Sequence, residues 1–285
     1  MKGFLALFLF VSSALAQNTP AEQTTAPPSA SGNPTAAQPQ TGQSSADQEN
    51  SRKAKDLIAQ MIQALGGPAY LNMQDMSQQG RTYSFFHGQP NSVGTLFWRF
   101  YKYPDKDRVE VTKQRDVVYL HTGDKGYEIT YKGTASEDPK LTDEYNRRRE
   151  HSMEWVVRKW LNEPGIALFY EGNTVAADKP AEQVTILNAK NDSVTLYLDA
   201  TTHLPIKKTF SWRDPTDKLR NTEEEVFDGY RNVQGIRTPF SVTRYENGDM
   251  ANQRFLHEVS YNTGLKDSLF EASITYDPKK LPGKH

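Results

Sequence analysis

The chain has 285 residues, no cysteine and a formal net charge of −1, from 34 basic and 35 acidic side chains. Without cysteine there is no disulfide framework, no thiol nucleophile and no thiolate metal site. The balance of charge gives no electrostatic reason to expect nucleic acid or a strongly anionic surface as a partner.

Residues 1–16 have the pattern of a secretory signal peptide. Lys2 precedes an apolar run over 4–11, and Ala14-Leu15-Ala16 follows before Gln17. The run is too short to span a bilayer, which takes about 20 residues. We therefore expect the mature chain to have no transmembrane segment and to be periplasmic, with secretion as the alternative.

Residues 17–50 differ in composition from the rest of the chain. They consist almost wholly of Gln, Thr, Pro, Ala, Ser, Gly and Asn, and they contain no aromatic residue and no Leu, Ile, Val or Met. Such a segment cannot bury enough apolar surface to offset its ordering entropy. We expect a disordered tether over 17–50, followed by one folded domain over 51–285.

The folded domain is predicted to open with a helix. Apolar residues recur at spacings of three and four over 51–65, which is typical of a stripe on one helix face. Gly66, Gly67 and Pro68 form a strong stop, because glycine takes the left-handed cap and proline cannot continue a helix. This helix must lie on an apolar surface, and a further short turn is expected over 69–73.

From Gly80 onward the pattern changes to strands. Short runs rich in Val, Tyr, Phe, Thr and Trp alternate with turn residues, which is typical of an antiparallel meander. Asn247-Gly248 is a tight-hairpin signal, because both residues tolerate positive φ. One stretch, 141–165, returns to helical spacing. The sequence thus predicts an α+β fold of about a dozen sequential strands, one leading helix and one helical insertion.

Several strands carry one apolar face. In the first of these strands, Leu96, Trp98 and Phe100 share a face. In a later strand Leu196 shares a face with Val194 and Leu198, and in the next strand Ile206, Phe210 and Trp212 share a face. A sheet of so many twisted strands should curl toward a barrel, with the helices against its inner surface. The candidate residues for a ligand cavity are Leu57, Ile58, Met61, Ile62, Leu65, Leu96, Trp98, Phe100, Leu196, Ile206, Phe210 and Trp212. The same residues could equally pack the barrel without leaving a hollow.

Three segments resemble LolA-like proteins. They are SVTLYLDATTHLPIKKTF (193–210), FDGYRNVQGIRTPFSVTRYENGD (227–249) and FLHEVSYNTGLKDSLFE (255–271). The resemblance implies an incomplete antiparallel β-barrel with helices across its open side. It also implies carriage of lipid or lipoprotein acyl chains in an apolar hollow, with membrane-associated donor or acceptor proteins as partners. The alternative within the superfamily is a regulatory or interaction module of the envelope.

No motif in the chain predicts catalysis or a cofactor. HEVSY has Tyr261 where a zinc protease needs its second histidine, and neither G-x-S-x-G nor a phosphate-binding glycine loop occurs. We therefore predict a protein that is not an enzyme, holds no metal and needs no cofactor. An unrecognised secreted hydrolase is the lower-ranked alternative.

Two polar clusters allow an alternative interpretation. His151 and Glu154, three apart, could bridge a metal, but with Arg147–Arg149 alongside we expect an exposed polar helix face. Glu223–Glu225 could supply a glycosidase carboxylate pair, but we expect a solvated outer strand.

Overall fold

One antiparallel sheet forms the framework of the computed structural model, which describes residues 45–277. Its hydrogen-bonded order is β7-β6-β5-β4-β3-β1-β14-β13-β12-β11-β10-β9-β8, with β2 paired to β1. The strands are β1 (Asp75–Phe86), β2 (Gln89–Pro90), β3 (Thr95–Lys102), β4 (Lys106–Val111), β5 (Val117–Thr122), β6 (Lys125–Thr130), β7 (Gly133–Ser136), β8 (Ala167–Ala176), β9 (Lys179–Leu187), β10 (Ser193–Asp199), β11 (Pro205–Arg213), β12 (Arg220–Val233), β13 (Ile236–Glu246) and β14 (Asp249–Tyr261).

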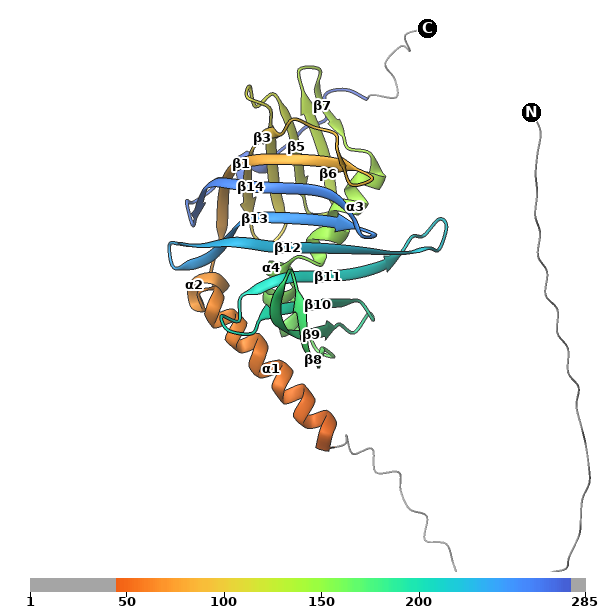
Figure 1. The fold of residues 1–285 in the computed structure, drawn as a ribbon. Helices are drawn as coiled ribbons and strands as arrows, with labels where there is room; N and C mark the ends of the chain where they lie inside the picture. The colour runs from red at the N-terminus through yellow and green to blue at the C-terminus, as the bar shows by residue number, and fades with distance from the viewer. Residues whose placement is uncertain (1–44, 278–285) are drawn as a thin grey trace, which may run out of the picture. The chain divides into compact units, whose positions relative to one another are not determined.

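The sheet is strongly curved and stays open, as Figure 1 shows. Its two edge strands, β7 and β8, do not pair, whereas β1 and β14, the first and last strands of the chain, pair with each other in the middle of the sheet. Pairing slips by one residue at four places, including Gln79/Gly80 and Tyr197/Leu198. Such bulges increase twist and bend the strands. The incomplete antiparallel barrel predicted from the sequence is confirmed.

The hairpin between β13 and β14 shows how local sequence sets this topology. Asn247 and Gly248 have φ of 51° and 88°, and Glu246 pairs with Asp249 across the turn. Few residues tolerate positive φ at both turn positions, and Asn-Gly is the favoured pair. The Asn247 side chain also accepts a hydrogen bond from the Thr222 amide at 2.9 Å, which ties the hairpin to β12. This predicted turn is confirmed.

The helices differ from the prediction in two respects. The described helices are α1 (Ser45–Leu65), α2 (Pro68–Leu71), α3 (Pro139–Glu150) and α4 (Met153–Arg158), with 3-10 turns η1 (Trp160–Asn162) and η2 (Asp267–Phe270). The leading helix begins at Ser45, so 45–50 belong to it and not to a tether. The single insertion is broken, because Ser152 caps a second helix by accepting a hydrogen bond from the Trp155 amide. The predicted signal peptide and tether residues 17–44 lie outside the described residues.

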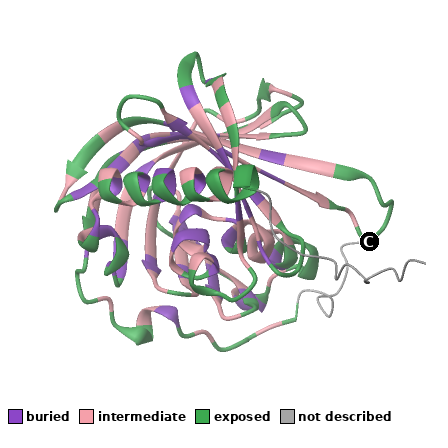
Figure 2. Cartoon of the chain, turned by 90° about the horizontal axis from the view of Figure 1, so that it is seen from below, coloured by how far each residue is buried: buried purple, intermediate pink, exposed green. Residues whose placement is uncertain are grey.

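Helix α1 lies across the concave side of the sheet with its apolar stripe inward, as Figure 2 shows. The buried positions of the stripe are Ala54, Leu57, Ile58, Met61 and Leu65. Near its start, the Asn50 amide donates to the Tyr170 carbonyl at 2.7 Å and accepts from the Tyr170 amide at 2.9 Å. Asn50 thereby satisfies a backbone pair on β8, which is an edge strand.

The end of α1 is placed against the β12–β13 turn. Gly66 has φ 129°, and a Cβ there would lie 2.4 Å from the carbonyl oxygen of Gly235 in that turn. Only glycine permits both the backbone conformation and this close approach. The predicted glycine stop therefore also fixes where the helix meets the sheet.

The half of the concave side beneath α1 is filled with side chains. Val184 and Ile186 of β9 and Val194, Leu196 and Leu198 of β10 are fully buried there, together with Val156, Val157 and Trp160 from the insertion. These residues form one continuous core with the α1 stripe. Among the described residues, the larger hollow lies toward the other half of the sheet.

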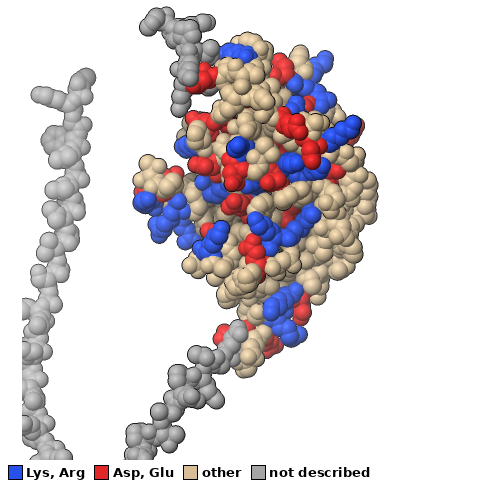
Figure 3. All heavy atoms as spheres, turned by 180° about the vertical axis from the view of Figure 1, so that it is seen from behind, with Lys and Arg blue, Asp and Glu red and all other residues tan. Residues whose placement is uncertain are grey.

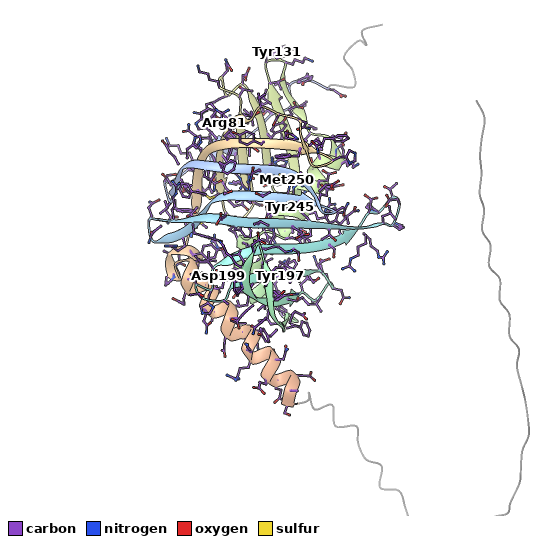
Figure 4. All side chains as sticks on the ribbon, viewed as in Figure 1. Arg81, Tyr131, Tyr197, Asp199, Tyr245 and Met250 are labelled. Atoms are coloured by element: carbon purple, nitrogen blue, oxygen red, sulfur yellow. The ribbon has the colours of Figure 1, made fainter. Side chains whose placement is uncertain are left out.

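The convex face is covered less extensively. Arg81, Tyr197 and Tyr245 lie on this outer face, as Figure 4 shows. The segment after β14 crosses to β4, where Asp267 bridges Lys102 and Lys106 at 2.8 and 2.9 Å. On the other face of the molecule, acidic and basic side chains are interspersed without a large patch of one sign (Figure 3).

Candidate ligand-binding cavity

A hollow of about 420 Å³ remains on the concave side. Its walls are the inner faces of β1, β3, β4 and β12–β14, and α2, α3 and α4 face them. A second recess of about 330 Å³ adjoins it and shares Tyr101, Tyr103 and Glu154 with its lining. The larger hollow is in the size range of ligand sites, about 300–1,000 Å³.

One end of the hollow is apolar. It lies where the C-terminus of α1 and the short α2 meet the β12–β13 turn. The side chains lining this end include Leu65, Tyr70, Met73, Met76, Phe227, Ile236 and Tyr261. Burial raises the pKa of Tyr261 to about 12 and also raises the pKa of Tyr70 well above its ordinary value, so both phenols stay neutral. The Tyr70 hydroxyl is buried and has no hydrogen-bond partner among the described residues.

The other end is charged. Glu225 of β12, Arg244 of β13 and Asn252 of β14 stand side by side in one row across the sheet, and all line the hollow. In the next row Phe227 pairs with Val242, and Val242 with Arg254. β12 and β13 therefore change from charged to apolar between these two rows, whereas β14 still carries Arg254 in the second row and becomes apolar at Leu256.

A buried ion pair forms part of the charged wall. The Arg99 guanidinium donates to both carboxylate oxygens of Asp107, at 2.9 and 2.8 Å, and the Tyr145 hydroxyl from α3 donates to the same carboxylate at 3.0 Å. Burial alone would lower the pKa of Arg99, but Asp107 outweighs that effect and raises it. Arg99 and Asp107 lie on adjacent strands, so this pair joins β3 to β4 and to α3.

A second ion pair lies at the border between the filled half and the hollow. Lys208 is 1% exposed, and its ammonium donates to the His151 carbonyl at 2.8 Å and meets Glu225 at 2.7 Å. Burial would raise the pKa of Glu225, but Lys208 and then Arg254 outweigh it and lower the pKa to about 2. Glu225 is therefore ionised at neutral pH and is already held by Lys208.

Glu223 is the next inward carboxylate on β12. It is buried, and Arg244 reaches its Oε2 at 3.3 Å, while Oε1 has no partner among the described residues. Burial, followed by the nearby charge of Glu225, raises the pKa of Glu223. Arg244 thus contacts Glu223 and lies directly opposite Glu225 on the adjacent strand.

The structure separates the predicted cavity residues into three groups. Leu65 lines the hollow, whereas Leu57, Ile58, Met61, Leu196 and Phe210 lie in the filled core, with Ile62 and Trp212 packed against it. The remaining four residues neither line the hollow nor belong to the main core; they are Leu96, Trp98, Phe100 and Ile206. Most of the predicted set therefore packs the barrel.

The predicted orientation of β3 is wrong. Phe97, Arg99 and Tyr101 line the hollow, so Leu96, Trp98 and Phe100 face outward. Outside, the Arg115 guanidinium lies over the Trp98 ring at 5.1 Å. Both faces of β3 are largely apolar, so the spacing of its apolar residues does not decide which face is inward. Arg99 lies on the inner face because Asp107 on the neighbouring strand neutralises it.

Ile206 is misplaced for a different reason. The bulge between Tyr197 and Leu198 shifts the pairing, so Leu198 faces Pro205 and Tyr197 faces Lys207. Ile206 falls between them and packs with Ala176, Ala181 and Tyr197, away from the main core. Strict alternation along β11 fails at this position because of the bulge.

The polar clusters also differ from the prediction of solvated surfaces. His151 is 7% exposed and stacks on Phe210 with ring centroids 4.4 Å apart, and Glu154 lies on a separate helix facing the hollow. Arg149 is buried, and Glu223 and Glu225 point inward. Burial lowers the pKa of His151. Sequence alternation gave no signal for these positions, because Glu223–Glu225 are consecutive and Arg149, His151 and Glu154 lie on or beside helices.

Known structures provide an independent comparison. No family model matches the sequence, and no curated protein is significantly similar to it. The fold is similar to a DUF1329 family protein from Desulfovibrio piger, with a TM-score of 0.54 and 14% identity over 78% of this chain and 97% of that one. It is also similar to a putative outer membrane lipoprotein-sorting protein domain from Vibrio parahaemolyticus, with a TM-score of 0.52 and 11% identity over 79% and 97%.

The chain has a LolA-like fold. A LolA superfamily protein from Nitrosomonas europaea aligns with a TM-score of 0.47 and 12% identity over 76% of this chain and 97% of that one. At this level of identity the likeness concerns the fold, so the function of this LolA-like chain is argued from its cavity. Between residues 45 and 277, no helix has both the length and the apolar character needed to cross a membrane. In the same range, no cluster of His, Asp and Glu is arranged to hold a metal ion.

Proposed function

We propose that the protein binds the acyl chain of a lipid or lipoprotein in the hollow of its half-barrel and carries it through the periplasm without catalysis. The observation that supports this most is the uneven filling of the concave side. One half is packed with side chains, whereas the other keeps about 420 Å³ free beside an apolar wall. Protein interiors are normally close-packed, so a hollow of this size fits a ligand site.

The energetics favour a chain over a small polar molecule at the apolar end. Each buried methylene contributes about 0.8 kcal/mol, so roughly ten would offset the several kcal/mol lost on association. The related fold of the lipoprotein-sorting domain from Vibrio parahaemolyticus is consistent with such cargo. Membrane-associated donor and acceptor proteins would then be its partners. A sensor with the same fold is the alternative, and it would also need this hollow.

The test fills the hollow. Val242 lies on its wall midway between the two ends, so Val242→Phe should occupy the space of the chain. The matched control is Val175→Phe, since Val175 is 71% exposed at the tip of the β8–β9 hairpin. We expect Val242→Phe to weaken binding of an uncharged fluorescent acyl ester by about tenfold or more, and Val175→Phe to leave it unchanged.

The same assay separates the alternatives. If Val242→Phe folds and binds the ester as well as the parent does, the hollow is not the site and the proposal fails. If the parent hydrolyses the ester during the measurement, the protein is an enzyme and the carrier proposal is wrong. Native mass spectrometry of protein purified from its host would identify the cargo.

A further inference from the structure

The lining of the hollow carries more positive than negative side chains. Six guanidinium groups and three carboxylates face it. The arginines are Arg99, Arg148, Arg149, Arg237, Arg244 and Arg254. The carboxylates are Asp107, Glu154 and Glu225. An apolar chain by itself gives no reason for this excess.

Pairing within the protein accounts for most of these charges. Asp107 is held by Arg99 at 2.8 Å, and Glu225 is held by Lys208 at 2.7 Å. Arg149 donates to the Gly123 carbonyl at 2.6 Å. Glu154 lies on α4, where it lines both the hollow and the adjoining recess, and Arg237 lies exposed near the start of β13. The carboxylates at the charged end are therefore already engaged.

Arg254 and Arg148 are left without a close partner. Among the described residues, the nearest carboxylate oxygen to Arg254 is on Glu225 at 4.0 Å, and the nearest to Arg148 is on Glu144 at 3.9 Å. Both distances exceed a hydrogen bond. Arg244, on β13 next to β14, is shared between Glu223 at 3.3 Å and Glu246 at 3.5 Å. The charged end thus combines two poorly neutralised guanidiniums with a third whose contacts are long.

Keeping these cations together costs stability. Burial, followed by repulsion from Arg99, lowers the pKa of Arg254, and burial lowers that of Arg148. About a third of each side chain stays accessible, 32% and 35%, on the wall of the hollow. A guanidinium presents a fork of donors that fits a carboxylate or phosphate. An anion placed there would relieve the repulsion and satisfy the free donors.

The gradient along the strands gives the anion an orientation. From Arg254 the inner face of β14 continues to Leu256 and Tyr261, and from Arg244 that of β13 continues to Val242 and Ile236. We propose that the ligand is an anionic amphiphile, with its carboxylate or phosphate head group at Arg254, Arg148 and Arg244 and its chain directed toward Ile236. This rests on the proposed function, because the same hollow must first accept the chain.

The experiment compares charged and uncharged ligands of equal chain length. Binding of oleate and of methyl oleate is measured by displacement of the fluorescent acyl ester from the parent, Arg254→Met and Arg148→Met. The control is Arg52→Met, since the Arg52 side chain is 71% exposed on α1. We expect oleate to bind the parent at least about tenfold more tightly than methyl oleate, because a charged hydrogen bond contributes about 1.5–3 kcal/mol.

The variants should remove that preference. Arg254→Met and Arg148→Met should weaken oleate about tenfold and leave methyl oleate within twofold, which also shows that they fold, and Arg52→Met should change neither. If the parent binds neither ligand, the proposed function fails. If it binds both equally, or if the variants weaken both equally, the anionic head-group site is wrong while the carrier stands. Inorganic phosphate at millimolar concentration should compete only weakly with oleate. Strong competition would contradict the proposal of an anionic amphiphile and indicate a site for a free anion.

Discussion

At the residue scale, two of the buried charges on the inner face, Arg99 and Lys208, are stabilised by a carboxylate on the adjacent strand. Lys208 is the clearest case, since it interrupts the apolar positions of β11 and is almost fully buried. Its partner Glu225 is directly opposite on β12. Removing one member of a buried pair leaves the other charge without compensation, which costs about 3–5 kcal/mol.

We therefore expect Lys208→Met to lower the free energy of unfolding by about 3 kcal/mol at pH 7, measured by urea denaturation. Lys207→Met is the matched control, because Lys207 pairs with Glu224 on the outer face, and it should cost under about 1 kcal/mol. If both variants lose the same free energy of unfolding, the buried ion pair stabilises the fold no more than the pair on the outer face does.

The ion pair between Lys208 and Glu225 also predicts that the free energy of unfolding falls at acid pH. Glu225 has a folded pKa of about 2, below its ordinary 4.5, so its contribution is complete above pH 4.5 and is lost as the pH falls toward 2. In Lys208→Met the pKa of Glu225 should rise, and the decline in stability over this pH range should become shallower. A parent whose stability stays constant from pH 5 to pH 2 would contradict the depressed pKa.

At the element scale, α1 is fixed at both ends to parts of the sheet far away in sequence. Asn50 bonds the backbone of β8, and Gly66 touches the β12–β13 turn. The stripe between them covers the filled half of the concave side. The helix thus extends from an edge strand to the apolar end of the hollow, where Leu65 forms part of the wall.

The N-terminal attachment can be tested by truncation. A chain beginning at Ser51 should be less stable than one beginning at Ser45 by about 1–2 kcal/mol, since it lacks Asn50 and its two hydrogen bonds to β8. Asn50→Ala in the longer chain should reproduce most of the loss. Thermal unfolding would measure both, and identical midpoints would mean that the helix needs no attachment here.

The C-terminal attachment can be tested at Gly66. Gly66→Ala should destabilise more than Gly88→Ala, although both glycines have positive φ, of 129° and 71°. The added Cβ meets the Gly235 carbonyl at 2.4 Å in the first variant and nothing within 4 Å in the second. The second variant measures the cost of a left-handed φ without a steric contact, of order 1 kcal/mol. Chemical denaturation should show a larger loss for Gly66→Ala, because it adds both the contact with Gly235 and a φ that alanine rarely adopts.

At the scale of the whole molecule, the open barrel is divided into a packed half and a hollow half. The packed half gives stability through α1 and the insertion, and the hollow half leaves apolar and charged walls without filling. A ligand that binds only the folded state stabilises it in proportion to the logarithm of its concentration, by about 2.7 kcal/mol at a hundred times Kd.

Calorimetry should show this linkage. Methyl oleate should raise the thermal midpoint of the parent by several degrees and leave that of Val242→Phe unchanged. The variant without ligand should melt no lower than the parent, because the phenyl ring enters existing space. A variant that melts far below the parent would mean that the wall around Val242 is packed and that no chain enters there.

Much of this architecture follows from local sequence. Helix α1, its glycine stop, the Asn247-Gly248 hairpin and the meander are set by periodicity and by positive φ, which act over a few residues. The orientation of β3, the bulge at Ile206, the burial of Lys208 and the start of α1 at Ser45 needed the tertiary structure. Three of these depend on a residue supplied by another element: Asp107 for Arg99, Glu225 for Lys208, and Tyr170 for Asn50. Whether a polar side chain can be buried is decided by its partner across the sheet, and sequence spacing alone does not specify that partner.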